Sequence, residues 1–406
     1  MVSVDNDAKF SREEVLIQRV IDHDLTSFSM SNTIARGVSS PFLWKRRNEL
    51  KTKQLRLHAV GRNGAYYEPK VMIHEKNLGP LAEGFARLRM KKVSICGTDH
   101  HVMSTDDSGK IRSTVSMRID GGGRILGHEG VGEVLELSSK CTTIEVGDHV
   151  ALESIFTCGA CERCRAGCFN QCLGAKLMGF EFDGLFSEIV DVPIRLLFDI
   201  SRKNPTDWDL EMACCLEPMS VAFLSVLNSG FPVGGKAMVL GGGPIGLYAA
   251  SFFKRSFSAL ETTIVETSRY RRKVAGEEFV SVAATIEDVI GTFDAVVDTT
   301  GNPQVIDSAV SVMNPNTTMV LLARTGKPIV ISKPDLLISR NLCIKGVRGH
   351  LGGIFERVWA TTSNPQNGFK SFLTTRLTGL EDISRSLSLT YEEVVEHNMK
   401  IIASLP

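Results

Sequence analysis

The segment MVLGGGPIG, residues 238–246, decides the fold of this chain. An apolar run typical of a buried strand leads into Gly241, Gly243 and Gly246, which stand in the register G-x-G-x-x-G. The first glycine permits a tight turn, the second lets a pyrophosphate approach the backbone, and the third allows a helix to pack closely on the strand. With a helix beginning at Pro244, the phosphates would lie at its N-terminus. The predicted dinucleotide residues of this turn are Gly241, Gly243, Pro244, Ile245 and Gly246.

Strand-like and helical runs alternate on both sides of this turn. The strand candidates are AMVL, TTIVE, DAVVD and TMVLLA, and helices are expected from Pro244 and through Arg271 to Phe279. Such alternation is typical of an α/β fold with a parallel, doubly wound sheet. We therefore predict a Rossmann dinucleotide-binding domain over residues 216–349.

Glu266 follows the second strand of this pattern, 25 residues after Gly241. A carboxylate in that place accepts hydrogen bonds from the adenosine ribose hydroxyls and repels a 2′-phosphate, which favours NAD. NADP remains open, because the arginines at 269, 271 and 272 carry the charge that pairs with such a phosphate. The other cofactor residues that we expect are Arg271, Thr300 after the strand DAVVD, and Arg348 in the crossover GVRGH, which also contains His350.

Residues 56–215 show a different pattern, in which short apolar runs are broken by glycine. GVGEVLEL at 130–137 and DHVALES at 148–154 are examples. This pattern is typical of a mostly β domain.

Residues 350–406 are expected to complete this β domain. They hold helix candidates at 352–361 and 381–388 and a closing strand, MKIIAS. Residues 1–55 are predicted to be an N-terminal extension with one helix candidate, which begins at Ser11.

The composition excludes several classes of protein. The 46 basic residues balance the 46 acidic ones and the sequence pI is about 7.1, so no net field draws the chain to nucleic acid or to an anionic membrane. No apolar run approaches the roughly 20 residues of a membrane helix, and the start MVSVDNDAKF lacks the basic and apolar parts of a secretory signal. We expect a cytoplasmic protein that acts on a small molecule.

Five of the ten cysteines lie in TCGACERCRAGCFNQC, residues 157–172. Cys158, Cys161 and Cys164 are separated by two residues each, and Cys172 follows after seven. A tight loop with this spacing can bring four thiolates to tetrahedral positions about 2.3 Å from Zn²⁺. Because four cysteines leave no open position on the metal, we predict a structural zinc site. The alternatives are an iron–sulfur cluster, disulfides, or Cys168 in place of Cys172.

Two further segments are SICGTDHH at 94–101 and LGHEGVGEV at 126–134. Alone, each would indicate a packed core cysteine or histidine. Together with the cysteine cluster and the glycine turn, in this order, they resemble the zinc-containing medium-chain dehydrogenases. The resemblance covers residues 56–406. It implies a GroES-like β domain joined to the Rossmann domain, and a homodimer or homotetramer.

The resemblance also implies a second, catalytic zinc. Cys96 and His128 match its protein ligands, and the polyol branch of the family adds the following glutamate, Glu129, directly or through water. Zinc with an open position binds the substrate oxygen and, as a Lewis acid, lowers the pKa of the alcohol.

Glu217, in the segment CLEPMSVAF, stands where the alcohol-dehydrogenase branch has a third ligand, a cysteine. This departure favours the polyol, sugar or amino-alcohol side of the family. The neighbouring Cys214 and Cys215 keep a cysteine ligand open.

Three residues between the ligands match supporting roles in the family. Asp99 matches the carboxylate that orients His128. Thr98 and His101 match the relay that carries the alcohol proton to solvent. His100 is interpreted as a solvated surface residue without a role in the site.

The interval between Cys96 and His128 is longer than in the family pattern. The segment DDSGKIRSTVSMRIDGGG, residues 106–123, is expected to form an inserted loop over the mouth of the site and to influence substrate choice.

The predicted reaction is the transfer of a hydride from the carbinol carbon of a polyol, sugar or amino alcohol to NAD, with two zinc ions in each chain. Two alternatives stay open. One is an NADPH-dependent reductase of an aldehyde or ketone, and the other is a zinc-bearing structural protein without turnover.

Overall fold

The computed structural model of the protein describes residues 50–406, apart from residues 114, 140, 142, 202, 203, 325 and 352. Residues 1–49 lie outside this description. They include most of the predicted extension and the helix expected from Ser11. The first described strand, β1, begins at Lys51.

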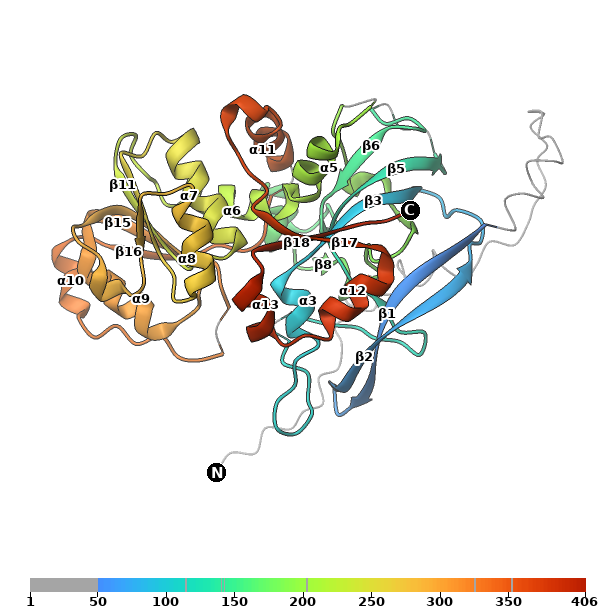
Figure 1. Cartoon of the computed structure of the whole chain (residues 1–406), viewed down its shortest axis with the longest axis horizontal. Coiled ribbons are helices and arrows are strands. Elements are labelled where there is room, and N and C mark those ends of the chain that lie inside the picture. Colours follow the sequence, from blue (N-terminus) through green and yellow to red (C-terminus); the bar gives the residue numbers. More distant parts are fainter. Residues whose placement is uncertain are drawn as a thin grey trace. The chain divides into compact units, whose positions relative to one another are not determined.

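A six-stranded parallel sheet forms the core of the cofactor half (Figure 1). Its strand order is β13-β12-β11-β14-β15-β16. The strands are β11 (Lys236–Leu240), β12 (Glu261–Val265), β13 (Ser281–Ala283), β14 (Phe293–Asp298), β15 (Met313–Leu321) and β16 (Cys343–Gly346). Because strand order reverses between β11 and β14, the crevice for a ligand lies at the carboxyl ends of these two strands. This sheet confirms the predicted Rossmann fold.

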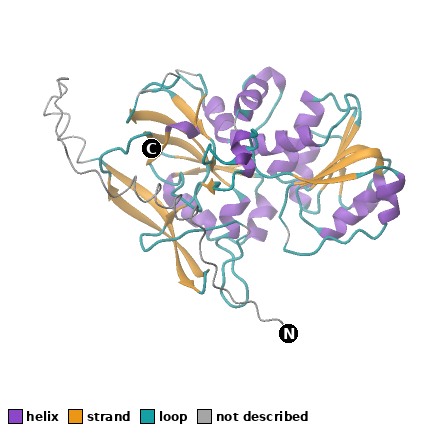
Figure 2. Cartoon of the chain, turned by 180° about the vertical axis from the view of Figure 1, so that it is seen from behind, coloured by secondary structure: helices purple, strands orange, loops and turns teal. Residues whose placement is uncertain are grey.

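Both faces of the parallel sheet are buried, which explains why its strands read as continuous apolar runs. On β11, Ala237 and Val239 face one core, and Met238 and Leu240 face the other; all four are fully buried. Figure 2 shows helices on both sides of the sheet. The helices that follow its strands are α7 (Pro244–Ser256), α8 (Arg269–Gly276), α9 (Pro303–Ala309) and α10 (Pro334–Ser339).

The GroES-like part is built on a seven-stranded sheet with the order β10-β6-β5-β3-β18-β17, with β9 also paired to β3. Its strands are β3 (Phe85–Ile95), β5 (Glu129–Leu137), β6 (His149–Leu152), β9 (Ile189–Pro193), β10 (Leu197–Asp199), β17 (Leu373–Thr378) and β18 (Lys400–Ser404). The predicted closing strand is β18, which pairs antiparallel with β3 and places Ile401 opposite Ile95. Segments from both ends of the described chain thus meet in one sheet.

Two small sheets complete the β part. The first is three-stranded and contains β1 (Lys51–Arg62), β2 (Ala65–Asn77) and β4 (Arg124–Ile125). The second pairs β7 (Ile155–Phe156) with β8 (Lys176–Leu177), and it joins the two ends of the cysteine-rich segment.

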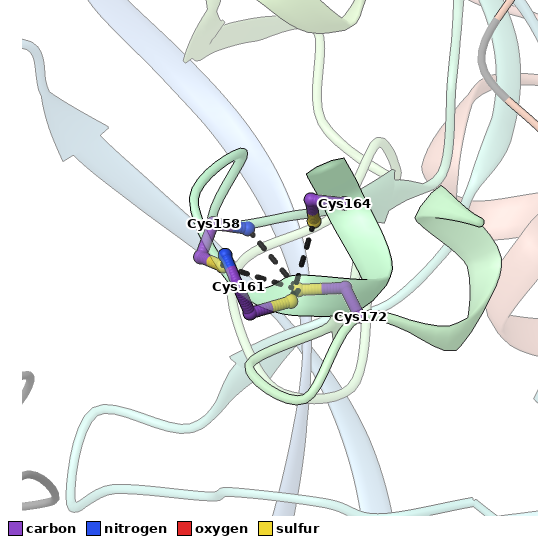
Figure 3. Close-up of side chains that lie close together, drawn as sticks. All are labelled: Cys158, Cys161, Cys164 and Cys172. Atoms are coloured by element: carbon purple, nitrogen blue, oxygen red, sulfur yellow. Dashed lines mark hydrogen bonds between the residues drawn. The ribbon is translucent and has the colours of Figure 1, made fainter. Parts of the chain in front are cut away.

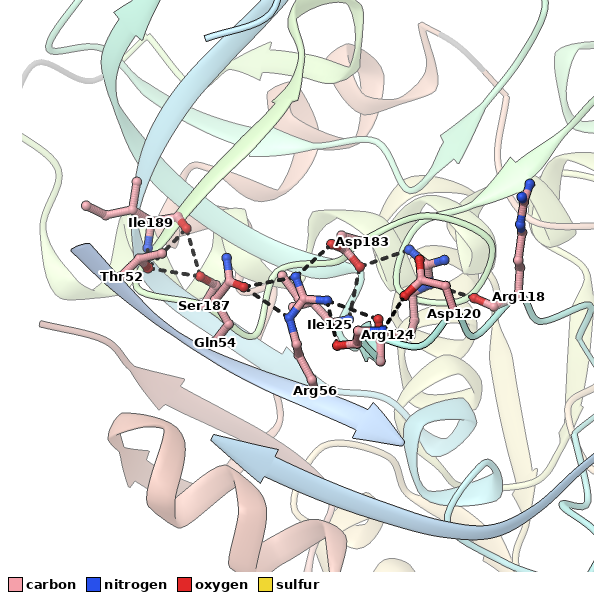
Figure 4. Close-up of polar contacts among 12 residues, drawn as sticks. Thr52, Gln54, Arg56, Arg118, Asp120, Arg124, Ile125, Asp183, Ser187 and Ile189 are labelled. Atoms are coloured by element: carbon pink, nitrogen blue, oxygen red, sulfur yellow. Dashed lines mark hydrogen bonds and ion pairs between the residues drawn. The ribbon is translucent and has the colours of Figure 1, made fainter. Parts of the chain in front are cut away.

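Residues 106–113 and 115–123 contain no named helix or strand and form a loop, and polar contacts attach the end of this loop to the β1–β2 hairpin (Figure 4). Its position over the mouth of the site stays a prediction. The Asp183 carboxylate pairs with Arg56 Nη2 at 3.2 Å and with Arg124 Nη1 at 2.9 Å. Arg56 also donates to the Gly123 carbonyl at 3.0 Å, and Arg124 Nε donates to the Arg118 carbonyl at 2.8 Å. One carboxylate therefore holds two arginines, one from the hairpin and one from the end of the loop.

The remaining helices lie around the β part and at its junction with the Rossmann sheet. They are α3 (Gly97–His101), α4 (Glu162–Arg165), α5 (Asp207–Cys214), α6 (Leu216–Asn228), α11 (Ile354–Thr362), α12 (Gly379–Leu387) and α13 (Tyr391–His397). Helices α11 and α12 match the two candidates in the C-terminal segment, whereas α13 was not predicted. In the described part of the chain no single helix is long and apolar enough to cross a membrane; only the bent pair α5 and α6 together passes that test of length and composition.

Candidate active site

Four cysteine side chains converge in the segment between β7 and β8 (Figure 3). The Cys158 and Cys172 sulfurs are 3.5 Å apart, those of Cys161 and Cys164 are 3.6 Å apart, and those of Cys161 and Cys172 are 3.9 Å apart. Ligands about 2.3 Å from a tetrahedral zinc are themselves separated by about 3.8 Å. The spacing fits four thiolates around one zinc ion. Cys168 is not part of this group.

Backbone N–H groups point at the sulfurs of this cluster. The Cys158 N–H donates to the Cys172 sulfur, and the Cys161 N–H donates to the Cys158 sulfur. Both distances are 3.3 Å. Hydrogen bonds from the backbone at Cys164 and Leu173 lower the pKa of the Cys161 thiol to about 6. The backbone therefore favours the thiolate, the form that binds metal, at Cys161. Burial acts in the opposite direction at two of the other cysteines: it raises the pKa of Cys164 to about 12 and also raises that of Cys172.

A second group joins two segments that the sequence singled out. Ligand atoms of Cys96, His128 and Glu129 all lie within 4.8 Å of one another. Cys96 is the residue before α3, and His128 and Glu129 stand at the start of β5. A soft sulfur, an imidazole and a carboxylate oxygen form a donor set that suits zinc.

Asp99 lies behind His128. Its Oδ1 is 3.8 Å from His128 Nδ1, and its Oδ2 accepts a hydrogen bond from the Cys96 backbone N–H at 2.9 Å. Burial raises the pKa of this fully buried carboxyl group, and its proximity to His128 opposes the shift. Asp99 thus hydrogen-bonds the backbone of Cys96 and lies close to His128, but at 3.8 Å its Oδ1 and His128 Nδ1 are not hydrogen-bonded.

Glu129 has a cationic partner from the far end of the described chain. Its Oε2 accepts hydrogen bonds from Lys400 Nζ on β18 and from the Ser94 hydroxyl on β3, and all three residues are buried. Burial opposes ionisation of Glu129, but the ion pair with Lys400 outweighs it and lowers the pKa of the carboxyl group. Sequence reasoning missed Lys400 and Ser94, because no local spacing connects either of them to Glu129.

Glu217, on the first turn of α6, faces two other buried polar side chains. Its Oε1 accepts a hydrogen bond from Ser154 at 2.7 Å and lies 3.8 Å from His350 Nε2. Ser154 Oγ is itself 3.3 Å from the same His350 nitrogen. Burial raises the pKa of Glu217, and the nearby His128 acts in the opposite direction. Glu217 therefore lies near the group of Cys96, His128 and Glu129, and its own polar neighbours are Ser154 and His350.

Thr98 and His101 lie on α3, one turn apart. The Thr98 hydroxyl is 3.7 Å from the Cys96 sulfur, and the His101 ring is half-buried against Tyr391 of α13. The interpretation of His100 as a solvated residue is wrong: it is 3% exposed, and burial lowers its pKa to about 4. The short helix α3 directs this side chain inward, which two adjacent histidines in a sequence do not reveal.

The glycine turn between β11 and α7 has the expected constraints. Gly241 has φ of 96° and its N–H donates to Val265, so the turn needs a residue without a side chain. A Cβ on Gly246 would lie 1.9 Å from the Gly241 carbonyl oxygen, which shows how closely the helix approaches the strand. Pro244 is the first residue of α7, and Ile245 follows it. These positions leave the amides at the helix N-terminus directed at the crevice.

The Glu266 carboxylate closes this turn from β12. Its Oε2 accepts from the Gly242 N–H at 2.8 Å and its Oε1 from the Ser268 N–H at 2.7 Å. The Thr267 hydroxyl also donates to Oε1 at 3.5 Å, whereas Oε2 keeps a lone pair for a ribose hydroxyl. A Cβ built on Gly243 would lie 3.2 Å from Arg271 Nη1. The Arg271 guanidinium therefore also borders the turn.

The two remaining cofactor candidates lie on loops. Thr300 follows β14, where its N–H and hydroxyl both donate to Asp298. The carbonyl of Arg348 accepts from the Asn170 side chain at 2.7 Å, which ties the crossover to the cysteine lobe. These contacts fix both loops.

Glu153 lines a cavity of about 160 Å³ together with Asn170, Arg195 and His350. Burial raises its pKa to about 7, against the opposing hydrogen bond from the Gly353 backbone. A carboxyl group with a raised folded-state pKa contributes stability that is complete below its unfolded pKa of about 4.5 and is lost as the pH rises through 7.

We therefore expect Glu153→Gln to stabilise the protein by about 2 kcal/mol at pH 8 and to have little effect at pH 4.5. Urea unfolding at both pH values measures the difference, with Glu162→Gln at an exposed position as the control. Equal effects of Glu153→Gln at both pH values would contradict the assignment of a neutral buried acid.

Comparison with known proteins agrees with this arrangement. Residues 82–202 match the alcohol dehydrogenase GroES-like domain. The L-threonine 3-dehydrogenase of Pyrococcus horikoshii is 30% identical over 294 residues, which are 69% of this chain and 79% of that enzyme. An alcohol dehydrogenase from Escherichia coli CFT073, described as short chain and complexed with NADH, superposes with a TM-score of 0.72 at 21% identity, covering 87% of this chain and 99% of its own. The 2R,3R-butanediol dehydrogenase of Bacillus subtilis superposes with a TM-score of 0.71 at 23% identity and the same coverage.

Proposed function

Since this chain belongs to the zinc-dependent medium-chain alcohol dehydrogenases, an oxidoreductase family that acts on CH–OH donors with a nicotinamide cofactor, we propose that it oxidises a polyol, sugar or amino alcohol with NAD. The observation that carries the proposal is the compact group of Cys96, His128 and Glu129, with Glu217 beside it. We assign these four residues to the catalytic zinc and Cys158, Cys161, Cys164 and Cys172 to a structural zinc. We also retain the proposed domains, 56–215 with 350–406 for catalysis and 216–349 for the dinucleotide.

The polar side chains beside Glu217 support a substrate with more than one polar group. Ser154 and His350 are both buried there and contact Glu217 or each other, while His350 Nδ1 is buried without a hydrogen-bond partner among the described residues. A polar surrounding of this kind suits a diol or amino alcohol better than an alcohol with one hydroxyl group, because a second polar group of the substrate can find a partner in it. The relatives named for L-threonine and for butanediol have substrates of this type.

Different residues of this chain serve different steps of the proposed reaction. When bound, zinc supplies Lewis acidity at the alcohol oxygen, and the nicotinamide accepts the hydride. Asp99, with its Oδ1 3.8 Å from His128 Nδ1, would orient the His128 ring, and Lys400 keeps Glu129 ionised. The Thr98 hydroxyl, close to the Cys96 sulfur, would accept the alcohol proton as it gives up its own, and His101 would take that second proton toward solvent.

Glu266 is expected to set the cofactor preference. Glu266→Ala removes the acceptor for the ribose hydroxyls and the charge that repels a 2′-phosphate, while Arg271 remains. The ratio of kcat/KM with NAD to that with NADP should then fall by about tenfold or more, which corresponds to about 1.4 kcal/mol. Thr285→Ala, away from the turn, is a control. An unchanged ratio would show that Glu266 only closes the turn, and would favour the NADPH-dependent reductase.

The test of the proposed function is NADH formation by the zinc-loaded protein with a panel of polyols, sugars, amino alcohols and simple alcohols. Turnover of the polar members above the simple alcohols supports the proposal. Preference for ethanol or another alcohol with one hydroxyl group would contradict the substrate class. No turnover with any member, but oxidation of NADPH with an aldehyde or ketone, would support the reductase instead.

We further propose a cytoplasmic homodimer or homotetramer. Among the strands that the structure describes, the outer strand of the Rossmann sheet, β16, has a neighbour on one side only, and Cys343 and Lys345 on it are exposed. An open strand edge of this kind can pair with a second copy of the chain. Light scattering of the purified protein measures the oligomeric state.

A further inference from the structure

Helix α13 connects the site to the cofactor half of the molecule. It lies against α3, which bears Thr98 and His101, and also against α8, which follows the cofactor strand β12. Its position is therefore defined from two sides. The residue that begins the helix is Tyr391.

The Tyr391 ring covers the active-site helix. Its centroid is 5.0 Å from that of the His101 ring, with the two planes at 42°. A Cβ placed on Gly97, the first residue of α3, would lie 3.7 Å from Tyr391 Cε2. The phenol ring thus reaches both ends of α3, from the residue after Cys96 to His101.

Tyr391 is itself held firmly. A capping box surrounds it: the Thr390 hydroxyl accepts from the Glu393 N–H at 3.2 Å, and the Glu393 carboxylate accepts from the Thr390 N–H at 2.7 Å. Val394, one turn further, is buried in the catalytic core. Such a cap stabilises the start of the helix and with it the backbone of its first residue.

The His101 ring has no such fixation of its own. Within the described residues no hydrogen bond to either of its ring nitrogens is made, and the charge that approaches it is that of Glu392. A half-buried imidazole without a hydrogen-bond partner changes rotamer freely unless packing prevents it. Packing against Tyr391 is the contact that can keep the ring in one orientation.

We infer that Tyr391 is a positioning residue, which keeps the His101 imidazole in one orientation on α3 for its part in the proton relay. The inference rests on the proposed function, because it gives His101 the role of proton acceptor. A relay requires its members to stay within hydrogen-bond reach, and a displacement of about 1 Å can lower a rate by up to a hundredfold.

The experiment compares Tyr391→Ala, Tyr391→Phe and His101→Ala in the zinc-loaded protein, with the best alcohol of the panel. Tyr391→Ala should lower kcat about tenfold without changing the KM for NAD, and Tyr391→Phe, which keeps the ring, should restore kcat. The double variant His101→Ala/Tyr391→Ala should be no slower than His101→Ala alone, because the tyrosine acts through the histidine. Glu396→Ala, at an exposed position on the same helix, is the matched control.

Three results would decide against the inference. Unchanged kcat in Tyr391→Ala, beside a loss in His101→Ala, overturns it and leaves the proposed function intact. Fully multiplicative losses in the double variant show that Tyr391 acts by another route. An unchanged kcat in His101→Ala removes the relay itself, and with it the role of Tyr391. Thermal unfolding of each variant separates lost positioning from lost folding.

Discussion

Replacing Cys96 by serine is expected to lower kcat/KM for the best alcohol by at least about a thousandfold, the equivalent of about 4 kcal/mol of transition-state stabilisation. The change removes the only soft ligand from the group that contains His128 and Glu129, and a serine hydroxyl does not ionise to replace a thiolate. Metal analysis should show zinc falling from two ions in each chain to one. The fold should persist, because the hydrogen bonds of Asp99 and Lys400 remain.

The control is Cys343→Ser, which changes an exposed thiol on β16 and should keep both zinc ions and full turnover. If Cys96→Ser retained two zinc ions and its activity, the catalytic zinc would have to lie elsewhere. If it retained one zinc and its activity, the chemistry would not depend on this metal at all.

Replacing Cys158 by serine should instead cost stability. Loss of one of the four thiolates is expected to release the structural zinc, whose binding contributes on the order of 10 kcal/mol in small zinc domains. The segment between β7 and β8 has only the 3₁₀ turn and the four-residue helix α4, so little else holds it. Deuterium uptake at residues 158–174 should rise strongly, and the free energy of unfolding should fall by several kcal/mol.

Cys168→Ser provides the matched control, since this cysteine lies in the same segment but outside the group of four. It should leave zinc content and stability unchanged. The opposite outcome, with Cys168 required and Cys158 dispensable, would mean that the ligand set is different from the one proposed. Retention of zinc after both replacements would exclude a four-cysteine site.

The features that could be predicted from the sequence alone are those that lie within short local motifs. The cysteine cluster and the glycine turn are each contained in fewer than 20 consecutive residues, so their spacing alone determines their geometry. The strands of the Rossmann sheet could also be predicted, because burial on both faces of the sheet requires continuous apolar runs in the sequence. His128 and Asp99 are separated along the chain, and they were placed together by a family resemblance and not by spacing.

The polar neighbours of the site were not predictable in this way. Lys400 reads as one more charged residue at the start of a strand, and its burial follows only from the pairing of β18 with β3. Ser154 and Tyr391 depend likewise on contacts between distant segments. His100 was placed on the surface because polar residues usually lie there, yet its side chain points inward on α3.

The pairing of Glu129 with Lys400 also has a consequence for the synthesis and folding of the enzyme. The two residues are separated by 271 positions, and the whole dinucleotide domain is made between them. At a synthesis rate of about 5 to 20 residues per second, Glu129 is incorporated roughly 14 to 54 seconds before Lys400. During that interval Glu129 lacks its buried counter-ion, and β3 lacks the pairing with β18 that the folded protein has. The newly made protein can therefore become active only after its final strand has been translated and docked.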